Sequence, residues 1–105
     1  MYRMGGKESE IDVVLRWLLD GVESKTYTFD IAKVRRVMER MGRRLSNPHI
    51  ARMLAERLDG GKVVIVDDRK RVWEIGYAEW ADKRDRRRYY ARVIGGVRGD
   101  EATIQ

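Results

Sequence analysis

The sequence predicts a small α+β domain that is mainly helical, with three amphipathic helices, a β-hairpin and an added C-terminal helix. Three observations support this. Apolar residues recur at helical spacing in segments 11–19, 31–41 and 50–58. Two β-rich runs, 62–66 and 71–75, flank a short charged stretch, which is the pattern of a hairpin. Glycines and the single proline fall at the boundaries of these segments.

The first helix is expected to begin at Ser9. Ser9 and Asp12 have the spacing of a capping box, with Asp in place of the usual Glu or Gln. Gly21 is expected to end the helix. The segment 26–29 then alternates polar with aromatic residues, which favours one short strand.

The second helix is expected to begin after Asp30, which is a good capping residue, and to end at Gly42. Its apolar stripe predicts one buried side. At 100° per residue, Lys33, Arg36 and Arg40 gather on the opposite side.

The third helix has the clearest start. Asn47 is expected to be its N-cap, with Pro48 at the first helical position, where a missing N–H costs nothing. Gly60 and Gly61 are expected to end it.

The two ends of the chain complete this division. Residues 1–8 are expected to form a flexible leader, and residues 95–105 a flexible tail. Residues 78–94 are expected to form the added helix, which is basic and aromatic.

Composition allows one domain with one modest core in the 105 residues. Charged residues make up 38% of the chain and the formal net charge is +6. Segment 33–57 alone carries 8 basic and 2 acidic residues, so it accounts for the whole excess. A basic segment of this kind favours polyanionic partners.

The order of helix, strand, helix, turn, helix and hairpin resembles the winged helix-turn-helix family over residues 9–77. The resemblance is carried by Asn47-Pro48 opening the third helix, Gly60-Gly61 closing it, and the hairpin of residues 62–75 with its basic tip. It implies that the third helix enters the DNA major groove and that the hairpin, called the wing, contacts the backbone or minor groove.

The resemblance implies that the N-terminal, outward positions of the third helix reach base edges: Ser46, Asn47, His49 and Arg52. Arg52 is the best base-reading candidate, because its guanidinium fits guanine O6 and N7. For His49, the alternative is an imidazole that is simply solvated at the surface.

Phosphate contacts are expected from the basic residues of the second helix and the turn after it: Lys33, Arg36, Arg40, Arg43 and Arg44. The alternative for Arg43 and Arg44 is a solvated turn whose arginines complement the dipole at the helix C-terminus.

The wing tip, Arg69, Lys70 and Arg71, is a second basic point that fits a narrow minor groove. Asp67 and Asp68 precede it and would repel phosphates, so a charged hairpin that resists edge-to-edge pairing is an equal interpretation.

Two tryptophans are expected to pack inside. Trp73 lies in a predicted strand with Val72 and Ile75, which favours a core position over a base-stacking one. Trp17 is assigned to the apolar region of the first helix.

The basic and aromatic stretch 83–92 fits either nucleic-acid contact or a dimerisation helix. We favour a homodimer interface formed by Trp80, Tyr90 and Ile94, since winged-helix proteins often dimerise through an added terminal helix.

The chain lacks the residues that several classes of function require. With no cysteine and one histidine, an ordinary zinc site, a disulfide and a cysteine nucleophile are excluded. There is no glycine-rich phosphate loop and no Ser-His-acid arrangement. We therefore expect no enzyme activity, no cofactor and no metal.

Location and source follow from the same composition. No apolar run is long enough to cross a bilayer, and the N-terminus is too polar for a secretory signal, so we expect a cytoplasmic protein, nucleoid-associated if prokaryotic. Asn47 and Gln105 are the only side-chain amides, and such depletion with abundant charge is typical of thermophiles.

The sequence thus favours a duplex-DNA-binding transcriptional regulator or a small chromatin-associated protein. The alternative is a winged-helix protein-interaction module in a transcription or replication complex, supported by acidic residues beside the presumed groove face. No motif in the chain separates DNA from RNA as the partner.

Overall fold

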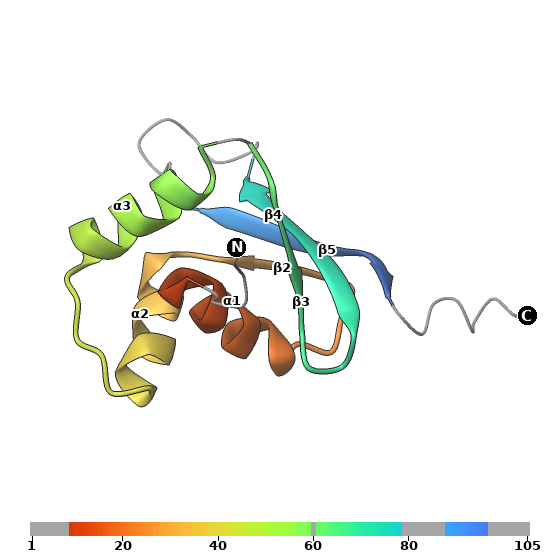
Figure 1. Cartoon of the computed structure of the whole chain (residues 1–105), viewed down its shortest axis with the longest axis horizontal. Helices are drawn as coiled ribbons and strands as arrows, with labels where there is room; N and C mark the ends of the chain where they lie inside the picture. The colour runs from red at the N-terminus through yellow and green to blue at the C-terminus, as the bar shows by residue number, and fades with distance from the viewer. Residues whose placement is uncertain (1–8, 60, 79–87, 97–105) are drawn as a thin grey trace, which may run out of the picture.

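The computed structural model describes residues 9–59, 61–78 and 88–96. Its elements, in chain order, are α1 (Glu10–Asp20), β2 (Thr26–Phe29), α2 (Ile31–Arg40), α3 (Asn47–Arg57), β3 (Val63–Val66), β4 (Arg71–Tyr77) and β5 (Tyr89–Gly96). The four strands form one antiparallel sheet in the order β2-β5-β4-β3. Figure 1 shows the three helices on one side of this sheet. The α+β class is confirmed, but a four-stranded sheet makes the expected mainly helical character wrong.

Hydroxyl and carboxylate side chains cap the first two helices as expected. The Ser9 hydroxyl accepts from the backbone N–H of Asp12 at 3.3 Å, and the Asp30 carboxylate accepts from the N–H of Lys33 at 3.1 Å. Each satisfies an amide that has no partner within the helix. Gly42, with φ of +87°, follows α2 in the left-handed region that favours glycine.

The third helix begins one residue earlier than the sequence predicted. Ser46, and not Asn47, is the N-cap, and its hydroxyl accepts from the N–H of His49 at 3.2 Å. Asn47 is the first helical residue, and its side-chain oxygen accepts from Arg35 of α2 at 3.0 Å. Serine and asparagine are about equal as N-caps, so the contact with α2 decides between them.

The core lies between the helices and one face of the sheet. Along β3, Val63 and Ile65 are buried whereas Val64 and Val66 are exposed, which is the alternation of a sheet covered on one face. Trp73 of β4 is fully buried among the helices' aliphatic side chains, so its predicted core position is confirmed. The largest fully buried side chains come from both layers: Trp73, Tyr89, Leu15, Leu19, Met38, Ile50, Leu54 and Ile75.

Trp17 does not share the apolar side of α1. The buried side of α1 is formed by Ile11, Val14, Leu15 and Leu19. Trp17, in contrast, is 55% exposed. At 100° per residue Trp17 lies roughly 135° from the centre of that buried arc, so the assignment to the apolar region is wrong.

The last described segment is a strand, and the helix expected over 78–94 is wrong there. Tyr89–Gly96 forms β5 between β2 and β4, in the interior of the sheet. Tyr89 and Ala91 are buried, Tyr90 between them is only partly buried, and Arg92 after them is exposed. Burial in the first half of β5 therefore alternates with a period of two residues, as in a strand. Without β5, the backbone N–H and C=O groups along one edge of β2 and one edge of β4 would have no strand partner, and β5 pairs with both strands. Residues 79–87, including Trp80, lie outside the described residues.

Candidate nucleic-acid interface

A row of three cations runs along the exposed side of α2. Lys33, Arg36 and Arg40 are all exposed. Among the residues that the structure describes, none of their side chains is paired with a carboxylate, in contrast to Arg35, which lies 3.7 Å from Glu39. Three like charges repel one another even with Glu39 and Asp30 near the ends of the row, and an anionic ligand relieves that repulsion.

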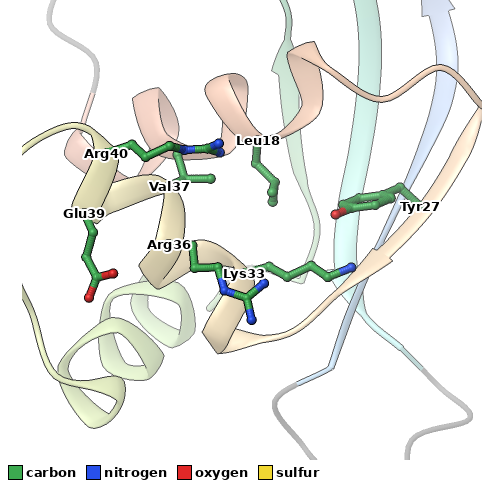
Figure 2. A pocket seen from close by; sticks show the side chains of 7 residues that line it. All are labelled: Leu18, Tyr27, Lys33, Arg36, Val37, Glu39 and Arg40. Atoms are coloured by element: carbon green, nitrogen blue, oxygen red, sulfur yellow. The ribbon is translucent and has the colours of Figure 1, made fainter.

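This row borders a pocket of about 570 Å³ between α2, α1 and β2. Figure 2 shows Lys33 and Arg40 extending toward the space between Leu18 and Tyr27, while Glu39 points away from it. The pocket therefore has an apolar floor and a cationic rim. It is lined by Leu18, Tyr27, Lys33, Arg36, Val37, Glu39 and Arg40.

Lys33 links this pocket to two further hollows along β2. Its ammonium lies 5.2 Å from the centre of the Tyr27 ring, within the range of a cation–π contact. The second hollow, of about 520 Å³, lies against Tyr27 and β5, and the third, of about 190 Å³, lies against Asp30. We call the three hollows the α2–β2 groove. Beyond the pocket, its walls include Thr26, Thr28, Phe29, Asp30, Arg88, Tyr90, Ala91 and Arg92.

The two arginines of the turn between α2 and α3 differ in their partners. Arg43 holds the Glu10 carboxylate of α1 through two contacts, one of them from Nη2 to Oε1 at 3.0 Å. This hydrogen bond is the main reason why the pKa of Glu10 lies below its usual value. Arg44 is exposed and, within the described ranges, has no carboxylate partner. Of the two predicted phosphate contacts, Arg44 is the available one.

The four residues predicted to read bases have different surroundings. His49 and Arg52 are exposed on α3. Ser46 and Asn47 are engaged within the protein, as the cap of α3 and as the acceptor for Arg35. The exposed side of α3 also carries Glu56, and the exposed Asp59 follows the end of the helix, so this region is less basic than α2.

The predicted contact residues do not all share one face. Arg35 marks the side of α2 that faces α3, since it donates to Asn47. Arg36 and Arg40 lie roughly 100° and 140° further round the helix. Arg44 is exposed in the turn that leads into α3, and His49 and Arg52 are exposed on that helix; by this position in the chain we call the three residues the turn–α3 face, and the row on α2 belongs to the α2–β2 groove.

The wing tip is tied to the end of α1. Arg71 donates to the carbonyl oxygens of Val22 at 2.7 Å and Leu19 at 3.1 Å, and its Nε donates to Asp67 at 2.8 Å. Arg69 donates to Glu23 at 3.1 Å. Both arginines predicted to contact the minor groove are therefore bonded within the protein. Arg69 and Lys70 are both exposed, and within the described residues Lys70, with φ of +72°, is the one of the three that has no carboxylate partner.

Sequence reasoning missed the role of Asp67. It was expected to repel phosphates, but it is 3% exposed and accepts from the indole N–H of Trp73 at 2.9 Å and from Arg71. A buried indole N–H needs a hydrogen-bond acceptor. The Asp67 carboxylate lies in the same hairpin as Trp73, and this proximity in sequence could have predicted the contact. Asp68 beside it is exposed and lies 3.7 Å from Arg16.

The predicted helical dimer interface is not formed as expected. Tyr90 lies in β5 and donates to Glu74 of β4 at 2.6 Å. Ile94 is also in β5 and is 49% exposed. Two of the three residues therefore sit on a strand within the sheet, and Trp80 lies outside the described residues.

Nowhere in residues 9–59, 61–78 and 88–96 do three or more His, Asp or Glu side chains gather in a way that would hold a metal ion. Within those ranges no helix has the length and apolar character that crossing a membrane requires.

Comparison with known proteins gives no relative: no family, no characterised protein and no solved structure matches the chain. The interpretation of its function therefore depends on the geometry and charge described above.

Proposed function

We propose that this protein binds nucleic acid, with duplex DNA as the partner of the turn–α3 face. The observation that supports this most is that cations of segment 33–57 stay exposed without a carboxylate partner among the described residues. They are Lys33, Arg36, Arg40, Arg44 and Arg52. A phosphate backbone supplies the missing countercharges and releases its own counterions, which drives association.

The winged-helix element order supports the duplex as the partner. The order α1, β2, α2, α3, β3 and β4 agrees with the order predicted for residues 9–77. In the proposed complex, the N-terminal half of α3 enters the major groove, with Arg52 at a guanine edge and His49 beside it. Arg44, in the turn before α3, holds an adjacent phosphate.

A protein-interaction module is the second candidate function, and two observations favour it. Glu56 is exposed on α3 as Arg52 is, and Asp59 is exposed just after the helix ends, so both would face a duplex unfavourably. Trp17 and Val64 are more than half exposed, at 55% and 54%, as residues at protein interfaces often are. A stoichiometric protein partner retained after nuclease treatment would select this function over the first.

A binding titration against a random duplex pool at about 50 and 200 mM salt tests the proposal. The wild-type protein should bind in the sub-micromolar range at the lower salt and far more weakly at the higher. Arg44→Ala should weaken all sequences alike and reduce the salt slope by about 0.9, whereas Arg52→Ala should blunt sequence preference. Lys62→Ala is the matched control. This exposed lysine directly precedes the edge strand β3 and already has a carboxylate partner, because it lies 3.6 Å from Glu74.

Absence of binding at low salt, or binding that does not change with salt, would refute the proposal. Equal losses in Lys62→Ala and Arg44→Ala would show that only net charge matters and not the turn–α3 face.

A further inference from the structure

We infer that the α2–β2 groove is a second nucleic-acid site, and that its ligand is a single strand rather than a duplex. The inference goes beyond the proposed function, because it gives the row of cations on α2 and the groove beside it a ligand of their own, whereas the duplex is assigned to the turn–α3 face. It begins from the composition of the pocket wall, which places apolar and aromatic side chains beside unpaired cations.

The floor of the pocket is unsuited to a duplex. Leu18 and Val37 line it, and Tyr27 of β2 stands at one side (Figure 2). A duplex presents phosphates and sugars outward and keeps the faces of its bases stacked inside. An unpaired nucleotide offers both a charged phosphate and a free apolar base face, and bases of single strands stack on aromatic side chains.

The cations are arranged for a chain of phosphates rather than one anion. Lys33 and Arg40 are seven residues apart on α2, so their Cα atoms are separated by roughly 10 Å along the helix axis. Arg36 lies between them on the same side. Cations spaced in this way can each contact a different phosphate of one strand, whereas one free phosphate would engage only part of the row.

The groove also continues past the pocket. Lys33 lines all three hollows, so the cationic wall extends from α2 to the edge strand β2. Thr26 and Thr28 of β2 are exposed there and offer hydroxyl groups to a sugar or phosphate. A path of this kind accommodates several nucleotides of a strand, and a free mononucleotide would fill only one hollow.

Tyr27 is the assigned stacking residue. It is half-buried, it stacks on Phe29 at a centroid distance of 6.0 Å, and the Lys33 ammonium lies over its ring. The Phe29 contact holds the ring in place before a ligand arrives, which lowers the cost of ordering it. A base that replaces the Lys33 contact frees the ammonium for a phosphate.

The test is fluorescence anisotropy with labelled oligothymidylate and oligouridylate of about 12 nucleotides, measured beside the duplex titration. Tyr27→Leu should weaken single-strand binding roughly five- to a hundredfold, and Tyr27→Phe should keep it within about twofold, because the ring is retained. Arg36→Ala should weaken it and reduce the salt slope by about 0.7. Lys62→Ala remains the control for loss of net charge.

The two proposals fail separately. Arg44→Ala and Arg52→Ala should weaken duplex binding and leave oligothymidylate binding within about twofold. Duplex binding without single-strand binding would overturn the α2–β2 groove proposal alone. Wild-type affinity in both Tyr27→Leu and Arg36→Ala would overturn it as well. Thymidine monophosphate that competes as strongly as the oligonucleotide would show that the ligand is a nucleotide and not a strand. Circular dichroism of Tyr27→Leu establishes that the variant is folded, and Arg36→Ala changes only an exposed side chain.

Discussion

Replacing Asp67 by asparagine should cost this domain about 3 kcal/mol of stability. The carboxylate is buried and its two oxygens have separate tasks. Oδ1 accepts from the backbone N–H groups of Arg69 and Arg71, each at 2.9 Å. Oδ2 accepts from the guanidinium of Arg71 at 2.8 Å and from the indole of Trp73 at 2.9 Å. Asparagine preserves one acceptor but turns an NH₂ group toward the guanidinium and the indole, so donors face donors.

The magnitude follows from burial. Removing one partner of a buried ion pair costs about 3–5 kcal/mol, because the other charge remains without compensation. The Arg71 side chain is 18% exposed, so water recovers part of that loss and the lower end of the range applies. For a domain of about 100 residues, about 3 kcal/mol lowers Tm by roughly 12–24 °C.

The assay is urea denaturation followed by far-UV circular dichroism, with Asp68→Asn as the matched control. Asp68 is the neighbouring residue, its side chain is 73% exposed, and its contact with Arg16 should be worth less than about 1 kcal/mol. An Asp67→Asn variant within about 1 kcal/mol of the wild type would refute the reasoning. A double variant with Arg71→Met should be less destabilised than the sum of the single variants, because both remove the same contact.

Three further predictions follow from the same structure. Burial raises the pKa of Asp67, but hydrogen bonds from Trp73 and Arg71 outweigh this and hold the pKa below its ordinary value. Asp67 therefore stabilises the fold above its unfolded pKa of about 3.9, and stability is lost as pH falls below about 4; acid titration should show a smaller loss in Asp67→Asn. Ser46→Ala should cost about 1 kcal/mol in urea denaturation and Ser46→Gly only a few tenths, since glycine is a tolerated N-cap; equal costs would argue against the capping role. Gly76→Ala should cost about 1–3 kcal/mol, because its Cβ would lie 2.9 Å from the Tyr90 ring, and much less in a Tyr90→Ala background; equal costs in both would contradict the clash.

Local patterns predicted the elements whose residues interact with near neighbours. The three helices, the strand at 26–29 and the hairpin were found from spacing, caps and turn residues, because each is stabilised within one short segment. The N-cap of α3 was displaced by one residue, since Ser46 and Asn47 are nearly equal caps and only the contact with Arg35 distinguishes them.

The candidate site was predicted only in part. The sequence identified the cations, and the structure separated them into the turn–α3 face and the α2–β2 groove. Tyr27 was missed because it was assigned only to a strand, and its position beside Lys33 depends on how β2 lies against α2. Arg43 was predicted as a phosphate contact and Arg71 as a minor-groove contact, but Arg43 is held by Glu10, which is distant in sequence, and Arg71 by backbone carbonyls at the end of α1.

The sequence by itself determined the apolar faces, the helix starts and the excess of positive charge in segment 33–57. Tertiary structure decided that Tyr89–Gly96 is a strand, because β2 and β4 leave a gap in the sheet that only a third segment can fill with hydrogen bonds. It also decided which cations remain available, because neutralisation of an arginine depends on which carboxylate the fold brings within reach. The composition of the sequence gives the number of charges, but the distances between side chains in the fold decide which arginines and carboxylates pair.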